Sequence, residues 1–236
     1  MTIAIIIALE EEAKILKNEL SLISEKKIQK DNIEIWQYKN HKIIINKCGV
    51  GKVNAATNTL QVLNDYSIDY LINIGSCGSI NKKINLGDLS LITNIFTFDV
   101  DLTAFNYLYG QIPNLPPYYS TNYQYLETFA KENQLFFNSI ASGDSFINSQ
   151  KKAKEIKKNL QQNIDLVDME SSGIAQIVFL KKVPLFVLKL VSDNVYLSEQ
   201  NEKQWKKHIN NISFKLSKIT LKLVKFIFNK GIKKHD

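Results

Sequence analysis

Short apolar runs alternate with longer amphipathic segments along this chain, and the alternation limits the folds open to it. Runs at 2–8, 70–74 and 183–191 have the length and composition of buried strands. Strands that alternate with helices predict a largely parallel or mixed sheet with helices on both faces. We therefore expect an α/β fold with a central mixed, mostly parallel twisted sheet. No linker interrupts the 236 residues, so we expect a single domain over 1–236.

The remaining elements follow from the same patterns. A helix is expected from Glu10 to about Leu20, and a tight Lys39-Asn40 turn joins two of the strands. Further strands are expected at 33–38, 42–47, 86–92, 135–141 and 164–167, and further helices at 52–62, 123–133, 149–160 and 170–180. The residues Gly75 to Ser79 read as a small-residue turn. A long helix at about 198–230, with Gly231 as its C-cap, closes the chain.

One long segment fits neither pattern. From Phe96 to Tyr119 the chain is irregular and aromatic, and it contains three of the four prolines. Irregular segments of this length are uncommon in compact domains unless they are functional. This composition suits an interface or the wall of a pocket.

The charge pattern argues against a nucleic-acid partner. The formal net charge is +7, but all 30 basic residues are lysine. Arginine is the preferred residue for bidentate recognition of bases and phosphates. The lysines are dispersed except in the last helix and tail, and no recognition motif accompanies them. We therefore expect no nucleic-acid binding.

The sequence also predicts where the protein is located and whether it needs a metal or a cofactor. No apolar run is long enough to cross a bilayer, and the first residues lack the basic region of a signal peptide. We expect no membrane association and a cytoplasmic location. Cys48 and Cys77 lack metal or redox spacing, so they read as free thiols of a reducing compartment. The three histidines are scattered, and no metal or cofactor is predicted.

Three carboxylates follow apolar strands: Glu12, Glu170 and Asp193. Each has a structural explanation of its own, since Glu12 and Glu170 complement helix dipoles and Asp193 suits a turn cap. In open α/β sheets, however, ligands bind outside the carboxyl ends of the strands. Because parallel strands end at one edge, the three side chains are expected to meet around a small molecule.

Motifs along nearly the whole chain carry a family resemblance. In order they are Ala8-Leu9-Glu10-Glu11-Glu12, Gly49-Val50-Gly51-Lys52-Val53, Asn73-Ile74-Gly75-Ser76-Cys77-Gly78, Asp101-Leu102-Thr103-Ala104-Phe105, Tyr109-Gly110-Gln111, Ser142-Gly143-Asp144-Ser145-Phe146-Ile147, Asp168-Met169-Glu170 and Val191-Ser192-Asp193. Together they resemble the bacterial 5′-methylthioadenosine/S-adenosylhomocysteine nucleosidases of the nucleoside phosphorylase superfamily. Residues after about 195 lack a clear match.

The resemblance implies hydrolysis of the bond between adenine and ribose in thioether nucleosides, with release of adenine and the thioribose product. It implies that 5′-deoxyadenosine is also a substrate. By resemblance, Asp193, oriented by Ser192, is the general acid at adenine N7, and Glu12 is the base for water. Glu170 would bind the ribose hydroxyls with the backbone of Met169. Glycosidases use the same arrangement, in which an acid protonates the leaving group and a base on the other side activates water.

The resemblance also implies binding roles. Phe146 would stack on adenine and the Ile147 backbone would read its edge. The other pocket residues implied are Ser76, Cys77, Gly78, Val167, Asp168, Lys189, Leu9 and Val50. From a second subunit, Phe105, Tyr107 and Pro113 would close over the thioether tail, which implies a homodimer. These three side chains could equally stabilise a dimer without touching the ligand, and Phe146 and Met169 could be ordinary core residues.

The chain departs from the family pattern at several positions. Lys189 stands where the family usually has arginine, and Asp168 replaces a glutamate that would partner this basic residue. Lysine keeps the charge but loses the planar fork. Leu9 replaces a common methionine, which is a tolerable apolar exchange. Trp205 is the candidate for the aromatic residue that covers the thioether.

Two alternatives come from other classes of protein. A phosphorolytic enzyme needs a site for a phosphate dianion, commonly built with arginine, and this chain has no arginine. A non-catalytic nucleoside-binding protein could share the fold, because fold does not determine function. The joint presence of Glu12, Glu170 and Asp193 argues against that alternative.

Overall fold

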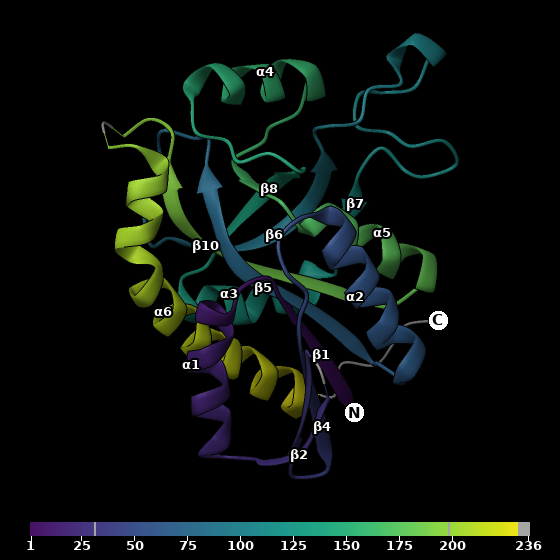
Figure 1. Cartoon of the computed structure of the whole chain (residues 1–236), viewed down its shortest axis with the longest axis vertical. Coiled ribbons are helices and arrows are strands. Elements are labelled where there is room, and N and C mark those ends of the chain that lie inside the picture. Colours follow the sequence, from purple (N-terminus) through teal and green to yellow (C-terminus); the bar gives the residue numbers. More distant parts are fainter. Residues whose placement is uncertain (31, 198, 231–236) are drawn as a thin grey trace.

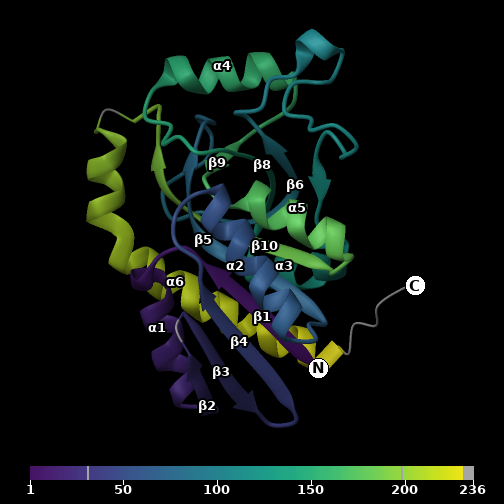
Figure 2. The same cartoon turned by 45° about the vertical axis from the view of Figure 1, so that its right-hand side comes forward.

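A computed structural model describes residues 1–30, 32–197 and 199–230. It contains one mixed sheet with helices on both faces (Figures 1 and 2), which confirms the expected α/β class. Figure 1 shows α1 and α6 on one side of the sheet, α2 and α5 on the other, and α4 above its upper end. Among the described helices, none is both long and apolar enough to cross a membrane.

The first half of the sheet is built around β1 (Thr2–Ile7), which pairs in parallel with both β4 (His41–Lys47) and β5 (Tyr70–Ser79). Strand β3 (Ile33–Tyr38) forms the expected hairpin with β4, and Lys39 takes a positive φ of 51° in its turn. An edge strand, β2 (Glu25–Lys30), was not predicted. It contains a single apolar residue, and it is held by backbone pairing with β3 rather than by an apolar pattern.

The second half is mixed. Strand β10 (Leu185–Asn194) lies parallel to β5 and antiparallel to β6 (Leu89–Thr97). Next to β6 come β8 (Phe136–Ser142), in parallel, and the two-residue β7 (Tyr119–Ser120). Strand β9 (Leu166–Asp168) joins β8 to β5. Strand β6 starts later than predicted because Gly87, with φ +82°, lies in the preceding turn.

Strands β5 and β10 both extend further than the sequence suggested. The expected turn at 75–79 is wrong, because these residues pair with β10 and continue the strand. Their small side chains reflect close packing: a Cβ on Gly78 would lie 3.0 Å from Asp193 Oδ2. Asp193 is likewise within β10 rather than after it, at a register shift that follows Val191.

Alternate residues of β1 enter two different cores, because successive side chains of a strand point to opposite faces. Ile3, Ile5 and Ile7 pack with residues of α1 (Glu10–Ser21) and α6 (Asn201–Lys230). Ala4 and Ile6 pack with residues of α2 (Lys52–Asp65) and α5 (Ser171–Lys181). This two-sided burial explains why the first strand reads as a continuous apolar run.

The remaining segments match the predictions in part. A 3-10 turn, η2 (Tyr123–Leu126), precedes α3 (Glu127–Asn133), and α4 (Gln150–Leu160) covers a third apolar cluster. The long helix begins at Asn201, later than expected, while the predicted C-cap Gly231 lies outside the described residues. Between β6 and β7 only the short η1 turn (Thr103–Phe105) is regular, and this segment projects from the upper right of Figure 1.

Gly173 lets α2 and α5 approach each other closely. A Cβ at this position would overlap the backbone carbonyl of Lys52, the first residue of α2. The same approach places the loop before α2 beside the start of α5, where a functional carboxylate was predicted.

Gly173→Ala should therefore lower the free energy of unfolding by about 1–3 kcal/mol, because the backbones must separate to admit a methyl group. Thermal denaturation would measure this, at about 2–4 °C for each kcal/mol in a chain of this size. Gln176→Ala, on the same helix and partly exposed, is the matched control and should change stability by less than about 0.5 kcal/mol. Equal melting temperatures for both variants would contradict the proposed close packing.

Candidate active site

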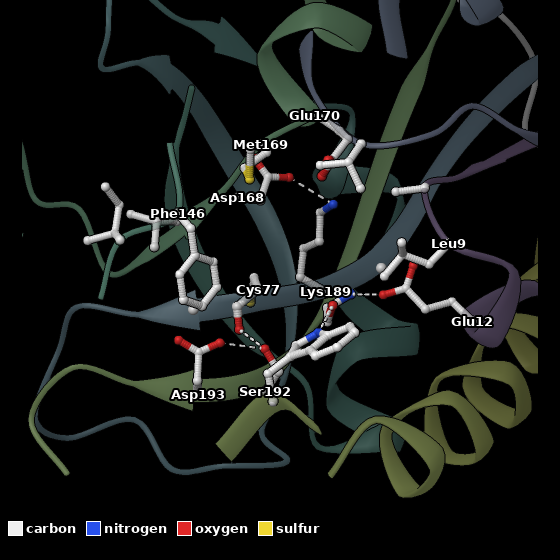
Figure 3. Close-up of a pocket in the computed structure, with 18 of the residues that line it drawn as sticks. Leu9, Glu12, Cys77, Phe146, Asp168, Met169, Glu170, Lys189, Ser192 and Asp193 are labelled. Carbon is white, nitrogen blue, oxygen red and sulfur yellow. Dashed lines mark hydrogen bonds and ion pairs between the residues drawn. The ribbon is translucent and has the colours of Figure 1, made fainter. Parts of the chain in front are cut away.

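A cavity of about 370 Å³ opens where the carboxyl ends of β1, β5 and β10 meet (Figure 3). Its walls come from the residues that follow β1, from the end of β5, and from the end of β10. The segments around Val50, Phe146 and Met169 and the first turns of α6 complete them. The cavity therefore lies where ligands bind in α/β sheets.

Fifteen of the eighteen predicted site residues line this one cavity. They are Leu9, Glu12, Val50, Ser76, Cys77, Gly78, Phe146, Ile147, Val167, Asp168, Met169, Glu170, Lys189, Ser192 and Asp193. The first and last of these are separated by most of the chain, so the fold brings distant motifs together. The other three, Phe105, Tyr107 and Pro113, lie in the projecting segment and are not among the lining residues.

Glu12 lies in the first turn of α1 but does not serve mainly as a charge at the helix end. Its side chain is only 2% exposed and lines the cavity. Oxygen Oε1 accepts a hydrogen bond from the backbone N–H of Ser76 at 2.7 Å. Within the described chain, Oε2 has no hydrogen-bond partner. Burial raises the pKa of Glu12, so this carboxylate is a stronger base than an exposed one.

Glu170 immediately precedes α5 and is held by the loop before α2. Gly51, with φ +98°, turns its backbone N–H toward Glu170 Oε1 at 3.0 Å. Burial and the neighbouring Asp168 raise the pKa of Glu170 to about 7, against opposing effects of Lys189 and the Gly51 N–H. Glu170 can therefore change its charge near neutral pH.

Lys189 projects from the middle of β10 into the cavity and is only 1% exposed. Its Nζ lies 2.8 Å from Asp168 Oδ2, which confirms the expected pairing of these two residues. Ser171 donates hydrogen bonds to Asp168 from both its backbone N–H and its Oγ. Burial alone lowers the pKa of Lys189, but the carboxylates of Asp168 and Glu170 outweigh it, and the pKa is raised. Lys189 is therefore charged.

Asp193 lies on the other side of the cavity from Lys189, near Phe146, as Figure 3 shows. Its Oδ1 is 2.7 Å from Ser192 Oγ, and its Oδ2 accepts a hydrogen bond from Asn201 Nδ2 at 2.6 Å. Burial raises the pKa of Asp193, although both hydrogen bonds act in the opposite direction. The side chain can thus hold a proton at higher pH than an exposed aspartate.

The charge balance of the cavity favours a cation. Four buried carboxyl groups line the cavity, those of Glu12, Asp168, Glu170 and Asp193, against one buried ammonium group, that of Lys189. Cys77 adds no nucleophile, because burial raises the pKa of its thiol well above the ordinary value. An electron-poor reacting centre would be stabilised here, whereas a dianion would be repelled.

Comparisons with known proteins identify the family of this chain. The family model described as the phosphorylase superfamily matches residues 2–225. A 5′-methylthioadenosine/S-adenosylhomocysteine nucleosidase of Bacillus subtilis is 32% identical over 234 residues, which cover 96% of this chain and 100% of the relative. This chain belongs to the 5′-methylthioadenosine/S-adenosylhomocysteine nucleosidase family. The Buchnera aphidicola nucleosidase is 36% identical over 224 residues, covering 92% of this chain and 95% of the relative.

Solved structures of this nucleosidase family share the fold. The Streptococcus pneumoniae enzyme in complex with 8-aminoadenine superposes with a TM-score of 0.85 at 27% identity. The match covers 95% of this chain and 99% of that one. The expected membership of the family and the α/β architecture are both confirmed.

Some residues that line the cavity were not predicted from the sequence. They are Ala8, Asn73, Ile74, Gly75, Ser145, Glu202 and Lys206, while Trp205 had been named only as a candidate. Glu202, Trp205 and Lys206 occupy one face of the first turns of α6, at spacings of three and four residues. Their nearness in sequence to Asp193 was the available signal. Trp205 Nε1 also donates a long hydrogen bond, 3.5 Å, to Ser76 Oγ.

Lys189→Met should destabilise the protein by about 3–5 kcal/mol, because it leaves the Asp168 carboxylate buried without its cation. Chemical denaturation measures the effect. Adding Asp168→Asn to Lys189→Met removes the uncompensated charge and should restore part of the loss. Strictly additive losses in the double variant would show that the two groups are not coupled.

The stability of the wild type should fall as rising pH ionises Glu170, and Glu170→Gln should abolish this fall. Glu170 has a pKa of about 7 when folded, against an ordinary value of 4.5, so the folded chain holds this proton more tightly. Between about pH 5 and pH 8, wild-type stability should fall by about 2 kcal/mol relative to the variant. Urea denaturation across this range is the measurement. The exposed Glu155→Gln is the control, and it should run parallel to the wild type.

Proposed function

We propose that this chain hydrolyses the N-glycosidic bond of 5′-methylthioadenosine and S-adenosylhomocysteine, and also that of 5′-deoxyadenosine. The observation that carries the proposal is the placement of two buried carboxyl groups with raised pKa, Glu12 and Asp193, on one cavity in a member of this family. Adenine leaves with the bonding electrons and water supplies the new bond to ribose. The products are adenine and the thioribose, or adenine and 5-deoxyribose when the substrate is 5′-deoxyadenosine.

Asp193 is the proposed general acid. As the bond between ribose and adenine N9 lengthens, electrons accumulate on the purine, and a proton placed on N7 neutralises them. The raised pKa of Asp193 keeps this proton available, and Ser192 at 2.7 Å orients the carboxyl group. Acids of this kind contribute about 10²–10⁴-fold to rate.

Glu12 is the proposed base. The backbone N–H of Ser76 holds Oε1, while Oε2 has no protein partner in the described chain and can accept a proton from water. Leu9 and Val50 also line the cavity and would contact the ribose and the thioether tail. Water that loses its proton to Glu12 as it attacks the ribose carbon completes the hydrolysis.

Glu170 is proposed to accept hydrogen bonds from the ribose hydroxyl groups, together with the backbone of Met169. Its Oε1 is held by Gly51, which leaves Oε2 for the sugar. The adjacent Lys189–Asp168 pair would bind and orient the same part of the substrate. Carboxylates here also stabilise the oxocarbenium-like ribose that forms as adenine departs.

The apolar wall is proposed to bind the base. Phe146, partly exposed in the cavity, would stack on adenine, and the backbone of Ile147 would hydrogen-bond to the adenine edge. Ser76, Cys77, Gly78 and Val167 close the pocket around the base and ribose. Trp205 would cover the thioether end.

A homodimer is proposed to complete the site. Phe105 is 71% exposed and Leu108 is 64% exposed, on the projecting segment that also carries Tyr107 and Pro113. Exposed apolar side chains of this kind suit an interface. From a second copy, Phe105, Tyr107 and Pro113 would reach the thioether tail of the substrate. We also place the enzyme in the cytoplasm, whose reducing conditions suit the free thiols of Cys48 and Cys77.

The decisive experiment follows adenine release from 5′-methylthioadenosine, with and without phosphate. Wild-type protein should release adenine equally in both conditions, and Asp193→Asn should be slower by about 10²–10⁴-fold, since its amide cannot act as the acid. Lys203→Ala, an exposed change on α6, is the control. Release that requires phosphate would make the chain a phosphorylase. Saturable binding without release would make it a nucleoside-binding protein.

A further inference from the structure

The amide group of Asn201 contacts Asp193 from outside the cavity. Asn201 is the first residue of α6, and it is only 4% exposed. Its Nδ2 donates a hydrogen bond to Asp193 Oδ2 at 2.6 Å, yet Asn201 is not one of the described residues that line the cavity. Asp193 therefore lines the cavity, whereas Asn201 contacts Asp193 from behind it.

A second side chain from the start of α6 binds the residue next to Asp193. Gln204, which is fully buried, accepts a hydrogen bond at 3.0 Å from the backbone N–H of Asn194, the residue after Asp193. Two consecutive residues of β10 are thus bound by two side chains from the start of α6. These two hydrogen bonds link the helix start to the strand end on either side of the carboxyl group.

We infer that Asn201 is a positioning residue for the general acid: it holds Oδ2 of Asp193 while Ser192 holds Oδ1, and it stabilises the carboxylate that remains after proton transfer. The inference rests on the proposed role of Asp193. With both oxygens held, the carboxyl plane cannot rotate, and the acid stays aimed at the base. Fixed donors of this kind lower the barrier without reorganisation during the reaction.

The other groups around Asp193 define what the Asn201 contact can change. On α6, Glu202 carries a negative charge that raises the pKa of Asp193, and Lys206 lines the same cavity. On β5, the Cys77 thiol has a pKa raised well above its ordinary value, and Gly78 packs on Oδ2. Val167, on β9, is uncharged and packs beside Gly78. Asn201 and Ser192 lower the pKa that burial raises.

The direction of the effect follows from these contacts. Loss of the Asn201 donor destabilises the ionised form of Asp193, so the pKa of Asp193 should rise further. The alkaline limb of the rate profile should then move to higher pH, because the acid stays protonated for longer. The rate on the plateau should fall, since a less stable carboxylate makes a weaker acid.

The test compares Asn201→Ala and Asn201→Asp with the exposed Lys203→Ala. In Asn201→Ala we expect the alkaline limb of the kcat–pH profile to move about one pH unit higher. The plateau value of kcat should fall about tenfold, and KM should be nearly unchanged. Asn201→Asp keeps the shape but replaces the donor with a negative charge, so its limb should rise further. Lys203→Ala should match the wild type.

A second measurement does not depend on turnover. The carboxyl ¹³C resonance of Asp193, assigned with Asp193→Asn, should titrate about one pH unit higher in Asn201→Ala than in the wild type. If Asn201→Ala turns over at the wild-type rate and the Asp193 resonance does not shift, the role of Asn201 is overturned and the proposed function stays intact. A lower KM at unchanged kcat would also overturn it, since Asn201 would then compete with substrate. A shift in a chain without turnover would support the contact and refute the proposed function.

Discussion

The buried contact between Lys189 and Asp168 supports the rest of the site. The buried carboxylates of the cavity would repel one another without a cation. Lys189 supplies that cation from the middle of β10. The ammonium group is also near Glu170 and Glu12, whose pKa values it lowers against the effect of burial. The pair therefore influences the charge of Glu12 and Glu170 and also links β9 to β10.

Different surroundings give chemically similar groups different proposed roles. Glu12 keeps one oxygen free and faces the cavity, as a base requires. Asp193 has both oxygens held by side chains and lies beside the apolar wall, which suits an acid that must keep a proton. Glu170 lies between Gly51 and the Lys189–Asp168 pair, and its pKa of about 7 lets it change charge near neutral pH. Position, rather than residue type, separates the three.

Much of this arrangement could be predicted because strand periodicity and strand ends are local signals. The expected site residues other than Phe105, Tyr107 and Pro113 line one cavity. What failed were features that depend on partners. Strand β2 has no apolar pattern and exists because β3 offers an edge. The residues after Gly75 read as a turn, yet pairing with β10 continues the strand.

The sequence by itself determined the alternation of strands and helices, the family, and the carboxylates at the strand ends. These depend on apolar periodicity and on short motifs that each residue carries with it. Only the tertiary structure decided which oxygen of each carboxyl group is held, that Lys189 is buried, and that Asn201 and Trp205 join the site from α6. The reason is physical: pKa values and hydrogen bonds depend on desolvation and on distances between residues far apart in the chain.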